Sequence, residues 1–170
     1  MIWLVHALNN KVMASFAGHE EEVSLAKFTL CDKSKHIVST STDKTIKVWS
    51  PLQANCVSTV RGKGDTGKAA FHQANILCMA LHHERPLALS GDAEGSVFAS
   101  QYMTGEVLGR IGKHADSCES IVFSKELPIA VSAGIDTNIF IYDLSNFSIR
   151  LTINFGQYGG ITKLKFSQNN

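Results

Sequence analysis

A short frame of residues recurs four times along this chain and limits the folds that it can form. Each copy begins at a polar residue and has apolar residues four and nine positions later. The copies begin at His19, His72, His114 and Gln157, so they are about 40 to 50 residues apart, which is typical of structural repeats. We therefore expect a fold of repeated units, each one a supersecondary motif.

Each unit continues with an apolar strand, a polar tight turn and a second strand that ends near an aromatic residue. Apolar and polar residues alternate in these segments, for example over residues 23–28, as in half-buried β-strands. The turn and aromatic positions are Asp43 and Trp49, Glu94 and Ser100, and Asp136 and Tyr142. The pattern predicts an all-β chain in which the second unit lacks the aromatic residue.

Composition excludes several other classes of protein. Apolar residues make up 44% of the 170 residues and charged residues 18%, which is typical of a folded globular chain and not of disorder. A net charge of +1 does not favour direct binding of nucleic acid, and no apolar run approaches the roughly 18 residues of a membrane span. The four cysteines have no paired spacing, and no signal peptide is evident. We expect a reduced protein of the cytoplasm, or also of the nucleus.

The repeated residues resemble those of the WD-repeat (WD40) family. Gly18-His19 and Trp49-Ser50 are similar to the beginning and the end of that repeat, and Tyr142-Asp143 is similar to its end. The resemblance implies part of a β-propeller, with three complete four-stranded blades and partial blades at both ends. It divides the single domain, residues 1–170, into the end of one blade (1–17), a blade (18–61), an inserted loop (62–75), two further blades (76–112 and 113–154) and the start of the next (155–170). We expect a fragment, or a piece completed by another chain.

The same resemblance implies a buried hydrogen-bonded set in each blade. An imidazole, a hydroxyl, a carboxylate and an aromatic donor satisfy one another only if the strands keep register, so the role is structural. The expected members are His19, Ser39, Asp43 and Trp49; His72, Ser90 and Glu94, with Ser100 in the aromatic position; and His114, Ser132, Asp136 and Tyr142.

Three chemical sites are weighed against this structural interpretation. A catalytic Ser-His-Asp triad is disfavoured because no nucleophile elbow occurs, so we expect no enzyme. Residues 62–68 imitate a phosphate-binding loop, but Ala69 stands where Ser or Thr would reach magnesium; a nucleotide-binding enzyme is the remote alternative. Cys78 near His82-His83-Glu84 lacks zinc spacing, so we expect neither a metal nor a cofactor.

Binding is expected at the rim where the first strands begin and the tight turns gather. In WD-repeat proteins such positions contact partners, and the matching residues are Glu22, Ser24, Thr42, Asn75, Leu77, Ala93, Ser117, Glu119, Ile135, Gly160 and Thr162. Acidic residues lie in or beside these loops: Glu20, Glu21, Glu22, Asp65, Asp92, Asp116 and Glu119. Basic residues are expected on the opposite rim: Lys33, Lys35, Arg85 and Lys125. We call the first set of loops the acidic rim, and we expect it to attract a basic protein or peptide.

Residues 71–166 also resemble the angio-associated migratory cell protein family. The resemblance lies in residues 104–109, Glu119-Ser120, residues 127–131 and residues 141–144. Fungal relatives in that family act as chaperones of a basic large-subunit ribosomal protein, which implies a role in ribosome biogenesis. The alternative is a general WD40 adaptor, such as a ubiquitin-ligase substrate receptor or a trafficking scaffold. The exposed edges of the terminal blades are expected to self-associate.

Overall fold

The computed structural model describes residues 1–31, 35–62, 71–156 and 158–167, and these residues form fourteen β-strands. None of the described residues is helical, so no helix among them could cross a membrane. All-β structure follows from the short alternating segments separated by polar turns. The sequence-based prediction of an all-β chain is confirmed.

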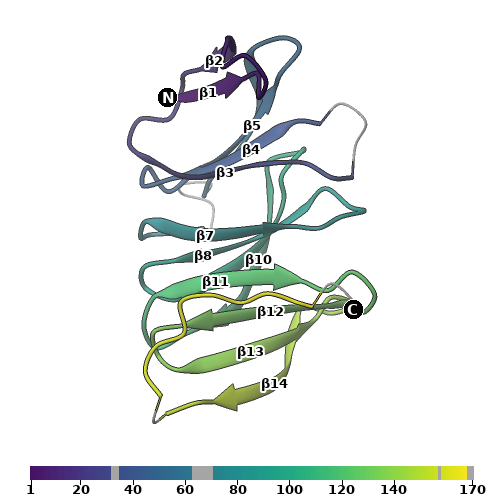
Figure 1. The fold of residues 1–170 in the computed structure, drawn as a ribbon. Helices are drawn as coiled ribbons and strands as arrows, with labels where there is room; N and C mark the ends of the chain where they lie inside the picture. Colours follow the sequence, from purple (N-terminus) through teal and green to yellow (C-terminus); the bar gives the residue numbers. More distant parts are fainter. Residues whose placement is uncertain (32–34, 63–70, 157, 168–170) are drawn as a thin grey trace.

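The strands form one hairpin and three four-stranded antiparallel sheets (Figure 1). The hairpin pairs β1 (Ile2–Val5) with β2 (Val12–Phe16). The first sheet contains β3 (Val23–Phe28), β4 (Ile37–Ser41), β5 (Ile46–Ser50) and β6 (Asn55–Val60). The second contains β7 (Ile76–Leu81), β8 (Leu87–Asp92), β9 (Ser96–Gln101) and β10 (Glu106–Lys113). The third contains β11 (Cys118–Phe123), β12 (Ile129–Gly134), β13 (Asn138–Asp143) and β14 (Ser148–Asn154).

In each sheet every strand pairs with the next one in the chain, which is the arrangement of a propeller blade. The three sheets follow one another down the molecule in Figure 1, with β3, β7 and β11 side by side. These first strands are therefore the inner strands of three blades. The chain forms part of a β-propeller, as the resemblance to the WD-repeat family implied.

The core is divided among the spaces between successive sheets. Phe16 of the hairpin packs with Ile37 and Trp49 of the first blade. Val48 of the first blade joins the cluster that contains Phe98 of the second. The third cluster joins residues of the second and third blades, such as Leu89 and Tyr142. Each blade thus buries its apolar faces against its neighbours, as stacked repeats do.

The tight turn between the second and third strands is the same in all three blades. Lys44, Gly95 and Thr137 have φ angles of 65°, 85° and 67° and donate their N–H groups to Ser41, Asp92 and Gly134, respectively. Only the second blade uses glycine at this left-handed position, although the turn requires the conformation in all three. At Gly95 a Cβ would lie 2.5 Å from the carbonyl oxygen of His114 in the next blade.

One predicted strand is not formed, and part of one predicted motif lies outside the described residues. Residues 161–166 were expected to form a first strand, but they are assigned no strand. A strand is defined by its ladder of backbone hydrogen bonds, and no described strand pairs with this segment. Several residues named in the sequence analysis lie outside the described residues: residues 63–68, which include Asp65, together with Lys33, Ala69 and Gln157. The next element after the phosphate-loop motif in the described chain is the strand β7 and not a helix.

Candidate functional site: buried polar sets and an acidic rim

The first blade holds a continuous chain of four buried polar side chains. Nδ1 of His19 donates to Oδ2 of Asp43 over 2.8 Å, because a carboxylate can only accept. The other ring nitrogen, Nε2, then accepts from the Ser39 hydroxyl over 2.7 Å. The Ser39 oxygen in turn accepts from Nε1 of Trp49 over 2.8 Å. The set joins the loop before β3 to β4, to the β4–β5 turn and to β5.

The third blade repeats this arrangement with a phenol in place of the indole. His114 donates from Nδ1 to Oδ1 of Asp136 over 2.9 Å and accepts from Ser132 over 2.8 Å. The Tyr142 hydroxyl lies 2.9 Å from the Ser132 oxygen and can donate to it. Burial raises the pKa of Tyr142, so its hydroxyl remains a donor at neutral pH.

In the second blade the carboxylate comes from a different residue than the sequence predicted. His72 donates to Oδ2 of Asp92 over 2.7 Å and accepts from Ser90 over 2.7 Å. The prediction that Glu94 fills this role is wrong, since Glu94 is exposed. Glu94 does occupy the turn position of Asp43, but Asp92, at the end of β8, already reaches the imidazole and also accepts from the N–H of Glu94.

The pKa values fit neutral imidazoles beside ionised carboxylates. Burial lowers the pKa of His19 and of His72, and the hydrogen bonds to their aspartates oppose this shift only in part. Burial alone would raise the pKa of Asp43, but hydrogen bonds from Thr45, His19 and the N–H of Glu20 outweigh it and lower the pKa to about 2. The pKa of Asp92 is lowered in the same way, chiefly by His72.

These sets are poor candidates for catalysis because their reactive atoms are enclosed. Ser39, Ser90 and Ser132 are each 0% exposed, and a substrate could not approach their hydroxyl groups without unfolding the blade. Each hydroxyl is also oriented by its imidazole within the sheet. The arrangement can fix strand register and satisfy buried polar groups, which is a structural role.

The acidic rim gathers its predicted residues through one repeated backbone hydrogen bond. The N–H of the residue before or within each turn donates to the carbonyl group of the residue before the first strand. The three pairs are Thr42 to Glu22, Ala93 to Asn75, and Ile135 to Ser117. Gly160 lies against Ile135, where a Cβ would come within 2.9 Å of the Ile135 Cα. Each of the three hydrogen bonds therefore holds the turn of a blade beside the beginning of the first strand of that blade, in the same way in all three blades.

Most side chains of the predicted binding set are accessible on this rim. Glu22, Ser24, Asn75, Leu77, Ala93, Ile135, Gly160 and Thr162 are exposed, and Thr42, Ser117 and Glu119 are half-buried. Four of them, Ser24, Thr42, Ser117 and Glu119, make hydrogen bonds within the protein. The Ser24 hydroxyl donates to the carbonyl oxygen of Ile76 over 2.7 Å, and the Ser117 hydroxyl donates to Oε1 of Glu119 over 2.6 Å.

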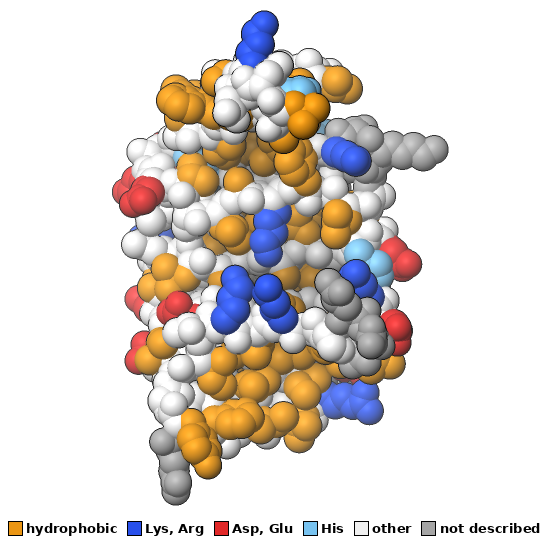
Figure 2. Space-filling model, in the orientation of Figure 1, with side chains coloured by type: hydrophobic (Ala, Val, Ile, Leu, Met, Phe, Trp, Pro, Cys, Tyr) orange, Lys and Arg blue, Asp and Glu red, His pale blue; other side chains and the backbone are white. Residues whose placement is uncertain are grey.

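The charge of the rim differs in detail from the sequence-based expectation. Asp92 is 1% exposed and bonded to His72, so it adds no surface charge. Glu94, assigned to the interior, is exposed at the β8–β9 turn. Glu20, Glu21, Glu22 and Asp116 are exposed as expected, and most of the charged side chains at the left edge of Figure 2 are acidic. Along the right edge of Figure 2, acidic and basic side chains mix. In the chain, the exposed Glu84 and Glu126 adjoin the exposed Arg85 and Lys125.

The histidine-rich turn after β7 has a local structural role. His82 is buried, and its Nδ1 accepts the N–H groups of Glu84 and Arg85, so the ring stabilises the turn. Cys78 instead lies beside Cys118, with 3.7 Å between the sulfur atoms. Within the described part of the chain, no three His, Cys, Asp or Glu side chains are grouped to hold a metal ion.

Comparisons with known proteins agree with this architecture. The family described as WD domain, G-beta repeat, matches residues 10–50. Pre-mRNA-processing factor 19 of Bos taurus is 28% identical over 163 residues, which cover 93% of this chain and 29% of that protein. Angio-associated migratory cell protein of Canis lupus familiaris is 27% identical over 123 residues, 64% of this chain and 27% of that protein. The chain thus spans less than a third of the length of these curated relatives.

Solved structures support the fold. The crystal structure of RRP9 WD40 repeats superposes with a TM-score of 0.73 at 20% identity and covers 85% of this chain and 42% of that one. The computationally designed Ika4 protein superposes with a TM-score of 0.72 at 25% identity, over 92% of this chain and 87% of that one. The blade arrangement is thus shared with proteins of very different sequence.

Proposed function

The chain is a WD40-repeat protein with a β-propeller fold, and we propose that it binds a basic protein segment on the acidic rim. WD40 domains typically act as protein-interaction scaffolds, and the division of side chains in this chain suits that role. The hydrogen-bonded histidine and serine side chains of the blades are buried, whereas the loops on the rim vary from blade to blade and are largely exposed. Loops held by a rigid scaffold are where binding residues concentrate.

The observation that carries the proposal is the convergence of acidic side chains at the ends of the first strands. Glu20, Glu21 and Glu22 lie beside the β4–β5 turn, since the N–H of Glu20 donates to Asp43. Asp116 and Glu119 hold the corresponding place one blade beyond Glu94. A line of carboxylates across three blades attracts a chain of Lys and Arg residues and fixes its direction of approach.

We propose as the specific partner a basic large-subunit ribosomal protein, which the chain would hold during ribosome assembly. The support is the resemblance of residues 71–166 to the angio-associated migratory cell protein family, together with the match to the dog member of that family. The chain would then act in the cytoplasm, or also in the nucleus. The alternative is an adaptor in a ubiquitin-ligase or trafficking complex, which would use the same rim for a different protein.

We also infer that the chain is not an enzyme. The three serines that could act as nucleophiles are enclosed, and each is hydrogen-bonded to a histidine inside its blade. Residues 63–68 of the phosphate-loop motif lie outside the described residues, and β7 follows them as a strand. The binding role therefore needs no chemistry from the chain.

The test is affinity purification of the chain from an extract of its own cells, at low and at moderate salt, with mass spectrometry of what is recovered. One variant reverses three rim charges, Glu20→Lys, Glu21→Lys and Glu22→Lys. A matched control reverses three exposed acids away from the rim, Glu84→Lys, Glu106→Lys and Glu126→Lys. Both variants change the net charge equally, so a loss confined to the first assigns binding to the rim.

We expect the wild-type chain and the control to recover one basic ribosomal protein, and the rim variant to lose it. Recovery of ubiquitin-ligase or trafficking subunits that the rim variant loses would keep the rim and favour the adaptor. Equal recovery by all three forms would contradict binding at the acidic rim.

A further inference from the structure

A second surface of the molecule has the opposite charge to the acidic rim. Lys27 of β3 and three lysines of other segments, Lys125, Lys163 and Lys165, line two adjoining hollows over the inner strands. Figure 2 shows Lys and Arg side chains down the middle of this face, with apolar side chains between them. We call this surface the lysine groove. It lies over the inner strands β3, β7 and β11, and residues 163–167 also line it.

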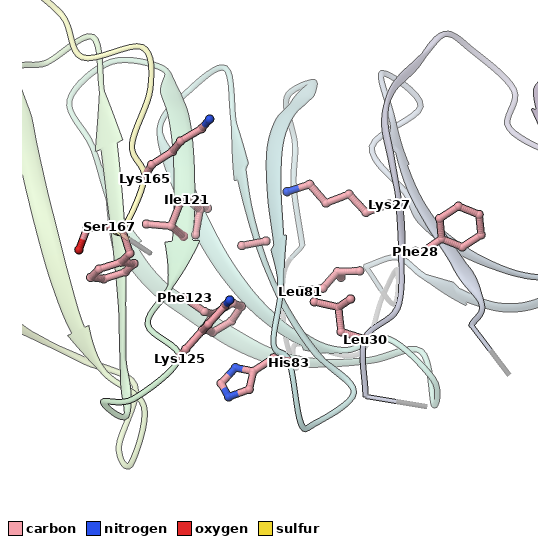
Figure 3. A pocket seen from close by; sticks show the side chains of 13 residues that line it. Lys27, Phe28, Leu30, Leu81, His83, Ile121, Phe123, Lys125, Lys165 and Ser167 are labelled. Atoms are coloured by element: carbon pink, nitrogen blue, oxygen red, sulfur yellow. The ribbon is translucent and has the colours of Figure 1, made fainter. Parts of the chain in front are cut away.

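The groove is continuous from one hollow to the next. The larger hollow measures about 490 Å³ and the smaller about 300 Å³, and both are lined by Lys27, Ile121, Val122 and Lys165. In Figure 3, Lys27 and Lys165 extend from opposite sides of the larger hollow, and His83 and Lys125 stand together at one end. A ligand lying in this groove would contact all three blades.

The floor of the groove is apolar and unusually open to solvent. Phe28 is 50% exposed and Leu30 is 70% exposed, and both line the larger hollow with Leu81, Phe123 and Phe166. Apolar side chains that gather on a surface mark a site of interaction. Hydrophobic contact here requires a ligand with a large apolar group, and not a bare anion.

The cations of the groove are poorly neutralised by the protein. Glu119 is the one acidic residue among the described residues that line the two hollows. Nζ of Lys27 donates to the carbonyl oxygen of Met79 over 2.7 Å, which is not a charge partner. Burial and the positive charge of Lys163 both lower the pKa of Lys27, so an added negative charge would relieve this repulsion.

We propose that the lysine groove binds an acidic peptide segment that carries a large apolar side chain. Carboxylates spaced along an extended peptide match lysines contributed by β3, by the turn after β11 and by residues 163–165. The apolar side chain occupies the floor beside Phe28 and Leu81. A uniformly charged polyanion such as RNA fits less well, because Glu119 lies in the groove, Glu84 and Glu126 flank His83 and Lys125, and the net charge is only +1.

This surface is distinct from the rim, except for two residues of the rim binding set, Leu77 and Glu119, which also line the smaller hollow. Glu119 is the acidic one of the two. Glu119→Gln should therefore weaken binding of a basic peptide at the rim and strengthen binding of an acidic peptide in the groove. Because this one substitution should change the two affinities in opposite directions, it tests the two proposals separately, and either can fail without the other.

The experiment is fluorescence polarisation with a labelled ten-residue peptide of alternating Glu and Gly around one central Phe. We expect Lys27→Ala, Lys163→Ala and Lys165→Ala together to weaken binding at least tenfold at low salt. The matched control removes three exposed cations elsewhere, Lys11→Ala, Lys44→Ala and Arg150→Ala, and should change binding less than threefold. Replacing the central Phe of the peptide by Ser should also weaken binding.

Two further measurements keep the test decisive. Because Lys27 bonds to Met79 across two blades, the pair Lys163→Ala and Lys165→Ala is measured as well, with circular dichroism to show that it is folded. The pair alone should weaken binding about threefold or more. Absence of binding by the wild-type chain, equal losses in the control, or tighter binding of a uridine decanucleotide than of the peptide would each overturn the proposal.

Discussion

The first and second blades each hold an imidazole, a hydroxyl and a carboxylate, although the carboxylate comes from different positions, Asp43 and Asp92. The blades differ completely at the fourth member of the set. In the first blade the Ser39 hydroxyl accepts the indole N–H of Trp49. In the second blade the matching residue is Ser100, whose hydroxyl is buried without a hydrogen-bond partner in the structure. The comparison teaches that the histidine and its two neighbours define the blade, while the aromatic donor can be exchanged.

The second blade replaces the lost aromatic volume from adjacent positions. Phe71 and Phe98 pack against the His72 ring, with centroids 4.6 Å and 4.8 Å away. In the first blade the His19 ring lies 5.8 Å from the Trp49 ring. The imidazole is therefore covered by aromatic groups in both blades, which protects its hydrogen bonds from water even where the tryptophan is missing.

Removing the tryptophan should have the largest effect on stability. Trp49 is 1% exposed, packs with Phe16 and holds the Ser39 hydroxyl. Trp49→Ala should lower the free energy of unfolding by about 3–5 kcal/mol, as expected for a large buried aromatic residue. Denaturation in urea, followed by circular dichroism, measures the change. A loss below about 1 kcal/mol would show that the first blade tolerates a small residue as the second does.

Replacing the buried carboxylate of the second blade should have the next largest effect on stability. Asp92→Asn should cost about 1–3 kcal/mol, because the buried His72 ring loses its charged acceptor. Glu94→Gln, at the turn position equivalent to Asp43, should change stability by less than about 0.5 kcal/mol, since Glu94 is exposed. Thermal unfolding of the two variants compares them directly. A larger loss of stability for Glu94→Gln than for Asp92→Asn would indicate that Glu94, and not Asp92, bonds to His72.

The contrast between Asp92 and Glu94 also shows which features of the blades could be predicted from the sequence. The alternation and spacing of the repeat predicted the strands, and the resemblance to the WD-repeat family implied the blades and the histidine and serine positions. The carboxylate was misplaced, because a side chain two residues earlier reaches the same atom once the turn is folded. The alternation of apolar and polar residues shows which residues of a strand face the core. Which carboxylate reaches the histidine across a turn depends on the folded geometry of that turn.

The lysine groove could not have been predicted in the same way. Lys27, Lys125 and Lys163 lie in three different segments far apart in the chain, and no local pattern connects them. The positions of the acidic rim could be chosen from the sequence, because they lie at fixed distances from the repeated histidines. Even there, burial removed Asp92 from the surface and left Glu94 on it.

Acid should weaken both blades through their histidines. The pKa values of His19 and His72 are lowered from 6.5 in the folded chain, so below that pH the unfolded chain binds more protons. The free energy of unfolding should therefore fall between about pH 7 and pH 5, and His72→Gln should show a smaller fall. Below about pH 4 a second loss should follow, as the pH approaches the lowered pKa of Asp43. Urea midpoints across this range give the slope, and no difference between wild type and His72→Gln would contradict it.

The smallest effect should come from the unpartnered serine. Ser100→Ala removes a buried hydroxyl that makes no hydrogen bond in the structure, so stability should stay equal or rise by up to about 1 kcal/mol. Ser90→Ala is the matched comparison and should destabilise, because the Ser90 hydroxyl bonds to His72. Calorimetric melting temperatures compare the pair. Destabilisation by Ser100→Ala would reveal that its hydroxyl has a partner.

The central claim is that the buried sets hold the fold and the rim binds the partner. The most direct measurement is titration of the chain with a labelled peptide of alternating Lys and Gly, alongside its thermal unfolding. We expect Glu20→Gln, Glu21→Gln and Glu22→Gln together to weaken peptide binding at least fivefold with an unchanged melting temperature. Asp92→Asn should lower the melting temperature and, at a temperature where it is folded, bind as wild type. Unchanged binding by the rim variant, or lost binding by folded Asp92→Asn, would contradict it.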